Sequence, residues 1–195
     1  MITYNVVVVG LGSHAINRII PTLVNMNQLK LFGVCSRNND IVKESAKKWD
    51  CFGWTNYKEM LKVPEIDVIY IATPIGLHFS YSEKALNAGK HVWCEKPLTS
   101  SYKKTDALMK LAEKNDRLIL ESFMYLYHPQ FKMVKKFIDD NKKLNSIICR
   151  FGIPKLENPG FRNDPELGGG SFWDLASYPI SAIISLFEEQ NAKVV

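Results

Sequence analysis

Hydrophobic residues in the first 121 positions follow two alternating patterns. Short apolar runs, rich in β-branched residues, predict strands at residues 4–9, 30–35, 66–72, 91–94 and 117–121. Between them, apolar residues recur at helical spacing and predict helices at residues 13–27, 41–49, 78–88 and 101–115. Because strands and helices alternate, and some strand runs are apolar throughout, we predict an α/β fold with a doubly wound parallel sheet.

The pattern changes after residue 121. An amphipathic helix is predicted around residues 131–138, ending near Asn141, and a strand at residues 147–151. A loop rich in proline, glycine and asparagine follows at residues 154–170 and leads to a helix at residues 172–187. We therefore predict a first domain at residues 1–121 and the start of an incomplete α+β domain at residues 122–195, since one strand and two helices are too few for a sheet domain.

Composition and charge exclude some classes of function. With 46% apolar and 23% charged residues, the chain has the composition of a soluble globular protein. Its net charge of +5 is spread along the sequence, and no basic run is interleaved with aromatic residues, so nucleic acid is not an expected partner. A mild positive charge would still suit the binding of an anionic small molecule. The four cysteines show no C-x-x-C spacing, which excludes the usual zinc sites. A signal-like N-terminus and a membrane-span-length apolar run are both missing from the sequence, so we expect a cytoplasmic protein without a membrane partner.

A glycine motif lies between the first predicted strand and the first predicted helix. The segment Gly10-Leu11-Gly12-Ser13-His14-Ala15 reads G-x-G-x-x-A. Gly10 permits a tight turn, Gly12 allows the backbone to approach a pyrophosphate, and Ala15 allows close helix–strand packing; Ser13 and His14 open the helix. In this context the motif predicts a Rossmann dinucleotide site rather than a structural turn. His14 fits a surface or packing residue better than a catalyst.

The end of the second strand indicates which dinucleotide binds. An NAD site usually has an acidic residue here for the ribose 2′-hydroxyl, but this chain has Ser36 followed by Arg37. Serine does not repel a 2′-phosphate, and a guanidinium can bind it with paired hydrogen bonds. We therefore predict NADP(H) rather than NAD(H). The alternative is that Arg37 is an exposed loop arginine.

Two further strand ends carry polar residues. Thr73 and Pro74 follow the strand at residues 66–72, where Thr73 could contact the cofactor near its nicotinamide. His78 follows near the start of a helix, where a helix-capping or solvent-facing role is the stronger interpretation.

Glu95-Lys96-Pro97 ends the next strand, where the proline cannot continue the hydrogen-bond ladder of the sheet. In an open α/β sheet, ligands bind beyond the carboxyl ends of strands, so Lys96 could bind the oxygen of a reacting alcohol or carbonyl; read alone, it fits a solvated surface lysine.

A second glycine-rich segment lies in the C-terminal part. Gly168-Gly169-Gly170 precedes the last predicted helix, on which Asp174 and Tyr178 are four residues apart and share a face. In isolation they fit a capping carboxylate and a half-buried aromatic residue. Opposite a lysine, they would form an acid–base set.

Taken in order, these motifs resemble the glucose-fructose oxidoreductase/inositol dehydrogenase (Gfo/Idh/MocA) family, and in particular its dimeric dihydrodiol dehydrogenase-type members. Those members also carry an aromatic-His-Pro segment like Tyr127-His128-Pro129. The resemblance runs from about residue 4 to the end of the chain. It implies an NADP-dependent oxidoreductase acting on a sugar, polyol or diol.

The resemblance also assigns roles. Lys96, Asp174 and Tyr178 would be catalytic: Lys96 stabilises negative charge on the substrate oxygen, Tyr178 exchanges its proton, and Asp174 orients the substrate or the lysine. The predicted cofactor-binding residues lie at the strand ends and are Gly10, Gly12, Ser13, His14, Ala15, Ser36, Arg37, Thr73, Pro74, His78, Glu95 and Lys96. Arg162 matches a loop arginine to which the resemblance gives no role.

Family members continue into a large, mostly antiparallel sheet that closes the pocket and commonly forms the subunit interface. The resemblance therefore implies that this chain carries only the beginning of the substrate domain, and that a homo-oligomer would need the remainder. Two interpretations stay open. The chain is an NADP-dependent oxidoreductase or a fragment of one, or it is a truncated, non-catalytic NADP(H)-binding module or the product of an interrupted reading frame. A purely structural domain would leave the glycine motif and Ser36-Arg37 without a purpose.

Overall fold

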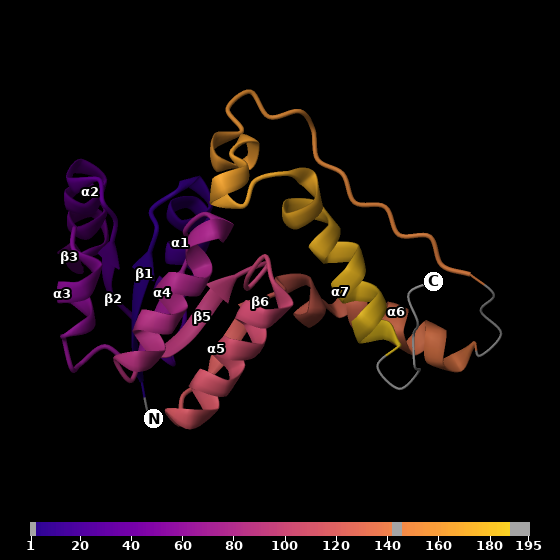
Figure 1. Cartoon of the computed structure of the whole chain (residues 1–195), viewed down its shortest axis with the longest axis horizontal. Coiled ribbons are helices and arrows are strands. Elements are labelled where there is room, and N and C mark those ends of the chain that lie inside the picture. The colour runs from indigo at the N-terminus through magenta and orange to yellow at the C-terminus, as the bar shows by residue number, and fades with distance from the viewer. Residues whose placement is uncertain (1–2, 142–145, 188–195) are drawn as a thin grey trace. The chain divides into compact units, whose positions relative to one another are not determined.

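A computed structural model describes residues 3–141 and 146–187. The chain divides into two compact units, Met1–Ser122 and Phe123–Val195. The first unit contains a six-stranded sheet in the order β3-β2-β1-β4-β5-β6 (Figure 1). Its strands are β1 (Tyr4–Val9), β2 (Leu29–Cys35), β3 (Phe52–Trp54), β4 (Val68–Ile71), β5 (His91–Glu95) and β6 (Ile119–Ser122).

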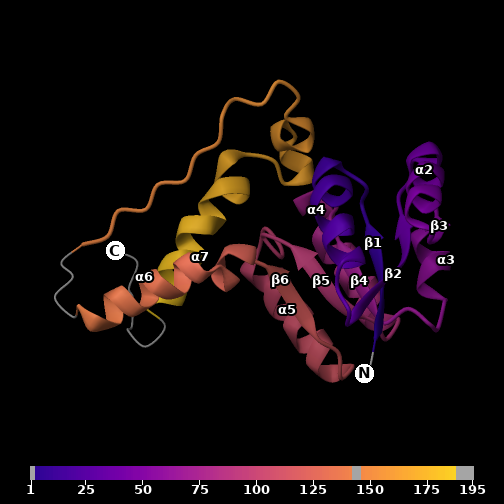
Figure 2. The same cartoon turned by 180° about the vertical axis from the view of Figure 1, so that it is seen from behind.

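All five pairs of neighbouring strands are parallel, which confirms the predicted doubly wound α/β fold. Helices connect the strands, as the views from front and back show (Figures 1 and 2). The helices of this unit are α1 (Ile20–Val24), α2 (Asn39–Trp49), α3 (Tyr57–Leu61), α4 (Ile75–Asn87) and α5 (Tyr102–Lys114). A π-helical turn, Ala15–Ile19, precedes α1.

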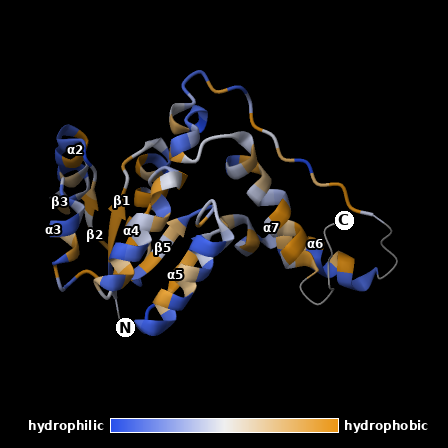
Figure 3. Cartoon of the chain, viewed as in Figure 1, coloured by the Kyte–Doolittle hydropathy of each residue, from blue (hydrophilic) through white to orange (hydrophobic). Residues whose placement is uncertain are grey.

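Two hydrophobic clusters cover the two faces of the sheet. Alternate strand residues point to opposite faces, so Val7 and Val9 pack with residues of α3, α4 and α5, whereas Val6 and Val8 pack with residues of α1 and α2. In Figure 3 the strands are coloured mainly as hydrophobic, while α2 and α5 carry both hydrophilic and hydrophobic residues. This burial on both faces explains the continuous apolar runs in the sequence.

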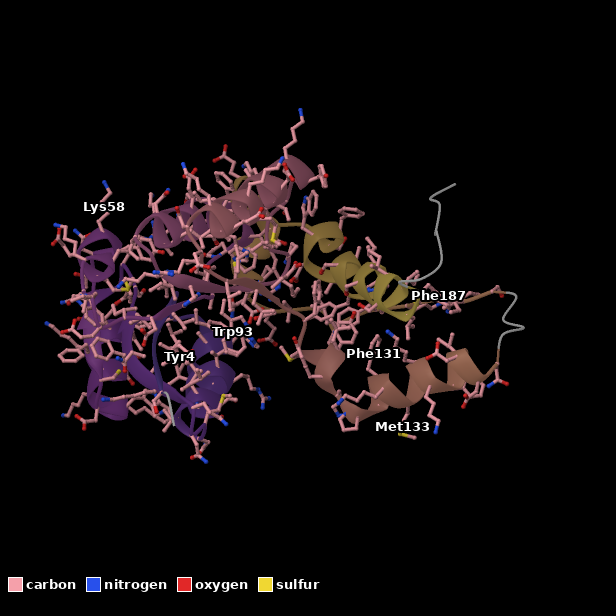
Figure 4. All side chains as sticks on the ribbon, turned by 90° about the horizontal axis from the view of Figure 1, so that it is seen from below. Tyr4, Lys58, Trp93, Phe131, Met133 and Phe187 are labelled. Carbon is pink, nitrogen blue, oxygen red and sulfur yellow. The ribbon has the colours of Figure 1, made fainter. Side chains whose placement is uncertain are left out.

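The second unit is built from two longer helices, α6 (Pro129–Asp140) and α7 (Ser177–Leu186). Short helical turns, Met124–Tyr127, Gly160–Asn163, Pro165–Leu167 and Phe172–Ala176, account for the rest of its regular structure within the described residues. Tyr125 and Ser181 share a hydrogen bond of 2.6 Å between their hydroxyls, which ties the start of the unit to α7. Met133 points away from α6 and is 71% exposed (Figure 4).

Some predicted elements are wrong. The strand expected at residues 147–151 does not form, since these residues pair with no strand in the described chain, and a strand needs a partner for its backbone groups. The sequence pattern also missed β3 and α3, which are only three and five residues long. The last expected helix begins instead as a π-helical turn at Phe172. Residues 188–195, the last part of the predicted second domain, lie outside the described residues.

None of the helices in the described residues is long and apolar enough to cross a membrane.

Candidate functional site

The polar segments predicted from the sequence lie at one edge of the first unit's sheet. The glycine motif follows β1, Ser36 follows β2, Thr73 follows β4, and Glu95 ends β5. Because the strands are parallel, these carboxyl ends meet at the same edge. The β1 turn lies where the strand order changes direction, between β1 and β4, which is the usual ligand position in such sheets.

The glycine turn is tight and leaves space for a ligand. Gly10 has a φ of +92°, and a Cβ there would lie 2.7 Å from the backbone carbon of Ala72, so a side chain is excluded. Among the described residues, a Cβ on Gly12 would meet no atom within 4 Å apart from those of its immediate chain neighbours and its own helix backbone. Ala15 is 1% exposed and packs in the cluster with Val8. The turn therefore offers open space directly beside a helix N-terminus, which suits a pyrophosphate.

The turn after β2 carries an exposed cation. The backbone N–H of Ser36 donates to the Trp54 carbonyl at 3.1 Å, and the Ser36 hydroxyl accepts from the Asn38 N–H at 3.3 Å. Arg37 lies between them and is exposed, while the Asn38 side chain caps α2. Arg37 is thus free of burial constraints and available to an anion at this edge.

Glu95 links the glycine motif to the segment that carries Lys96. Its Oε1 accepts hydrogen bonds from Nε2 of His14 at 3.1 Å and from the hydroxyl of Tyr70 at 2.5 Å. Burial alone would raise the pKa of Glu95, but the hydrogen bonds from His14 and Tyr70 outweigh it, so the pKa lies below its ordinary value. Burial, and then the charge of Glu95, raise the pKa of Tyr70. Tyr70 therefore remains a donor to a Glu95 carboxylate.

His78 does not face solvent, which corrects the expectation for this residue. It is 1% exposed, and its two ring nitrogens lie 2.9 Å from the Pro97 carbonyl and 2.8 Å from the Thr73 carbonyl. Burial lowers the pKa of His78, while its two carbonyl partners oppose that shift. The helix-capping interpretation is also wrong, because α4 begins three residues earlier at Ile75, after Pro74. His78 instead connects two strand-end loops.

The Thr73 hydroxyl is buried and has no hydrogen-bond partner in the part of the chain that the structure describes. Ser13, at the start of the first helix, is exposed, and its hydroxyl accepts from the Asn17 side chain at 3.1 Å.

In the second unit, Asp174 is held by Arg162. Asp174 lies in the π-helical turn after the three glycines and is 8% exposed. Its Oδ2 accepts a hydrogen bond from Nε of Arg162 at 2.7 Å, which gives the loop arginine a partner that the sequence did not suggest. Both residues line a hollow of about 360 Å³ together with Lys155 and Asn163.

Tyr178 lies in an aromatic cluster of the same unit. Its ring stacks on Phe151, with centroids 4.4 Å apart and an interplanar angle of 16°. The rings of Phe123 and Tyr125 lie 6.1 and 6.0 Å from it, at interplanar angles of 77° and 55°. Apolar packing fixes the ring and leaves the residue partly exposed.

The structure joins several predicted residues directly: His14 with Glu95, and His78 with Thr73 and Pro97. Lys96 belongs to the first unit, and Asp174 and Tyr178 belong to the second, so their joint action stays a prediction. The sequence did not predict two contacts at this edge: the hydroxyl of Tyr70 donates to Glu95, and a carboxylate oxygen of Glu121 accepts from the Leu98 N–H at 2.7 Å. The signals were a hydroxyl within an otherwise apolar strand and an acidic residue at the end of β6.

Curated relatives with named activities resemble this chain. A dTDP-3,4-didehydro-2,6-dideoxy-alpha-D-glucose 3-reductase from Saccharopolyspora spinosa is 32% identical over 177 residues, covering 90% of this chain and 53% of the relative. A scyllo-inositol 2-dehydrogenase (NADP+) from Bacillus subtilis is 28% identical and covers 88% of this chain and 55% of the relative. The chain thus spans about half the length of the curated relatives it matches.

Solved structures share the fold. A 3-ketoreductase from Actinomadura kijaniata, in complex with NADP and TDP-benzene, matches with a TM-score of 0.85 at 28% identity, covering 94% of this chain and 57% of that one. A myo-inositol 2-dehydrogenase from Lactobacillus plantarum matches with a TM-score of 0.78 at 26% identity, covering 94% of this chain and 56% of that one.

The family described as the oxidoreductase family with an NAD-binding Rossmann fold matches residues 4–123, which is more than half of the chain. This match confirms the resemblance inferred from the motifs: the chain belongs to the Gfo/Idh/MocA oxidoreductase family.

Proposed function

We propose that the protein is an NADP(H)-dependent oxidoreductase that transfers hydride between the nicotinamide and a hydroxyl or carbonyl carbon of a sugar, polyol or diol. The observation that carries this proposal is the glycine turn of the first unit. It follows β1 at the point where the strand order changes direction, opens a helix, and is hydrogen-bonded through His14 to the Glu95-Lys96-Pro97 segment. A dinucleotide and a lysine would therefore meet at one sheet edge.

The residues at this edge fit NADP(H). The open space at Gly12 would take the pyrophosphate at the helix N-terminus. Arg37 would bind the 2′-phosphate, and Ser36 places no carboxylate against it. The named cofactors of the relatives support the same choice, since the ketoreductase contains NADP and the scyllo-inositol dehydrogenase is NADP+-dependent.

When bound, the cofactor would accept hydride from a carbinol carbon or return it to a carbonyl carbon. The hydroxyl that loses hydride must also lose its proton, which Tyr178 would accept; in the reductive direction the same phenol would donate it. Lys96 would stabilise negative charge on the substrate oxygen, because an ammonium group beside a developing alkoxide lowers its energy. Asp174, fixed by Arg162, would orient the substrate.

The cofactor proposal is tested by titrating the protein with NADPH and NADH and following the fluorescence of the reduced nicotinamide. We expect tighter binding of NADPH, and we expect Arg37→Ala to remove the preference by weakening NADPH about tenfold, as loss of a charged hydrogen-bond pair would. Equal affinity of the unchanged protein for both dinucleotides would contradict the role of Arg37. Failure to bind either would contradict the dinucleotide site itself.

The catalytic proposal is tested by screening sugars, polyols and diols for oxidation with NADP+. Lys96→Ala should abolish turnover but leave NADPH binding nearly intact, and the exposed Lys58→Ala should change neither. Equal loss of turnover and binding in Lys96→Ala would argue against its catalytic role. Binding without turnover in the unchanged protein would favour the second function, that of a non-catalytic NADP(H)-binding module. That function is considered because the chain matches only about half of its relatives' length.

A further inference from the structure

The backbone that follows Lys96 is held by a buried histidine. The Pro97 carbonyl lies 2.9 Å from Nδ1 of His78, a residue of α4. The next residue, Leu98, donates its N–H to Oε1 of Glu121, on β6, at 2.7 Å. Pro97 and Leu98 are both buried. The two residues directly after the lysine are therefore each bound by a side chain from another element.

The same imidazole reaches the loop after β4. Nε2 of His78 lies 2.8 Å from the Thr73 carbonyl. Thr73 in turn lies against the glycine turn, since a Cβ on Gly10 would be 2.9 Å from its backbone nitrogen. The helix that carries His78 packs into the hydrophobic cluster through Ala85 and Leu86. His78 thus joins the lysine turn to the loop beside the glycine turn, from an element that the core holds in place.

A neutral imidazole cannot donate to both carbonyls, because it has one N–H and its other nitrogen is an acceptor. Burial lowers the pKa of His78, which favours the neutral ring. The contact with Pro97 is buried, whereas that with Thr73 is only partly buried, so an unsatisfied carbonyl would cost more at Pro97. The proton therefore belongs on Nδ1, facing Pro97.

We propose that His78 is a positioning residue for Lys96: its Nδ1–H donates to the Pro97 carbonyl and fixes the turn that carries the lysine. This inference rests on the proposed catalytic role of Lys96, because a lysine that stabilises charge on a substrate oxygen must be held in a defined place. His78 acts through the backbone and need not touch substrate or cofactor.

The protonated nitrogen of His78 is the first test, and it uses the unchanged full-length protein. Long-range ¹H–¹⁵N correlations of the ring, recorded at neutral pH without cofactor or substrate, show which nitrogen carries a proton. We expect a protonated Nδ1. An unprotonated Nδ1 would overturn the proposal, because the ring would then donate only to Thr73.

Two variants separate the two ring nitrogens. The amide nitrogen of asparagine is as many bonds from Cα as Nδ1 of histidine, and that of glutamine is as many as Nε2. His78→Asn should therefore keep the donor to Pro97, and His78→Gln should lose it. Hydrogen exchange of the Leu98 amide, followed by NMR, should be about tenfold faster in His78→Gln, as for one lost hydrogen bond, and nearly unchanged in His78→Asn.

The matched control is His91→Gln, which replaces a histidine at the opposite end of β5 and should leave the exchange of Leu98 unchanged. Equal exchange of Leu98 in His78→Asn and His78→Gln would overturn the proposal, because a side chain that only fills space is replaced by either amide with a similar loss. If neither variant folds, the ring measurement on the unchanged protein decides.

These measurements are independent of the proposed function, because neither needs turnover. A protonated Nδ1 and faster Leu98 exchange in His78→Gln, in a protein without oxidoreductase activity, would contradict the enzyme assignment while His78 still holds the turn. Where activity is found, His78→Gln should lower kcat about tenfold with little change in the Kd for NADPH, and His78→Asn should retain most of the turnover. The same kcat in both variants would show that the turn is held for a purpose other than Lys96.

Discussion

At the scale of single residues, the first unit is organised around the carboxylate of Glu95. Its side chain is 14% exposed, and it accepts hydrogen bonds from a buried tyrosine and from an exposed histidine of the glycine motif. Hydrogen bonds to a charged acceptor are stronger than those between neutral groups, and they lose strength when the acceptor is protonated. The glycine turn and the lysine segment are therefore connected through one ionised group.

Tyr70→Phe should destabilise the protein in a pH-dependent way. The variant keeps the buried ring and loses the donor to Glu95, so the free energy of unfolding at pH ~7 should fall by about 1–3 kcal/mol. Because the folded pKa of Glu95 is depressed, its contribution is present above the carboxyl's unfolded-state pKa and is lost as the pH falls through the folded value. Urea unfolding of both proteins across this acid range measures the difference, which should shrink toward low pH.

The matched control is Tyr102→Phe, which removes a hydroxyl from a residue that is 83% exposed and should leave stability unchanged. A Tyr70→Phe protein as stable as the unchanged one at pH ~7 would show that the short bond to Glu95 contributes nothing.

At the scale of elements, the glycine turn shows two glycines with different roles. Gly10 needs its positive φ and lacks room for a Cβ, whereas the part of the chain that the structure describes places neither constraint on Gly12. The first glycine therefore serves the packing of β1 against the loop after β4. The second fits the proposed dinucleotide site, where the backbone would approach the pyrophosphate.

Gly10→Ala and Gly12→Ala should accordingly fail in different ways. Gly10→Ala forces a Cβ against the Ala72 backbone in a left-handed conformation and should cost more than ~2 kcal/mol of stability. Gly12→Ala should melt at the same temperature or higher, yet bind NADPH about tenfold more weakly, because its methyl group occupies the pyrophosphate position. Thermal unfolding and fluorescence titration separate the two effects. Unchanged NADPH affinity in Gly12→Ala would place the pyrophosphate elsewhere.

The elements that the sequence predicted well are those with long, periodic patterns. β1 has the predicted bounds, since four consecutive valines leave little ambiguity. β3 escaped notice because an edge strand of three residues with Phe52 exposed carries no pattern. The run at residues 147–151 has strand-like composition, but propensity cannot supply a partner strand.

The candidate site shows the same limit. Motifs identified the strand ends, because each glycine turn or Glu-Lys-Pro segment is local in sequence. Tyr70 and Glu121 escaped because they act on residues 25 and 23 positions away, and only the strand order brings them together. The strand-end segments were therefore predictable from local sequence, while the contacts that join them required the tertiary structure.

At the scale of the whole chain, the two units differ in how they bury apolar surface. Every residue of the two hydrophobic clusters lies between Val6 and Ile119, inside the first unit. Within the described part of the second unit, large apolar side chains remain exposed on both long helices, among them Met133, Phe137 and Ile184. The first unit therefore has the core of an independent domain, and its stability should not depend on the second.

A protein comprising residues 1–122 should consequently fold alone and retain dinucleotide binding. Its six strands, both hydrophobic clusters and the proposed NADP(H)-binding residues are all present. We therefore expect one cooperative thermal transition, with a midpoint within about 5 °C of that of the first unit in the full chain, which corresponds to a change of about 1 kcal/mol in the free energy of unfolding. A shorter control, residues 1–115, lacks β6 and leaves β5 unpaired along one edge, and it should lose the transition. Calorimetry and NADPH titration of both proteins make the comparison. If the protein of residues 1–122 does not unfold cooperatively, the first unit depends on the second for its stability. If it folds but does not bind NADPH, residues beyond Ser122 are needed for the dinucleotide site.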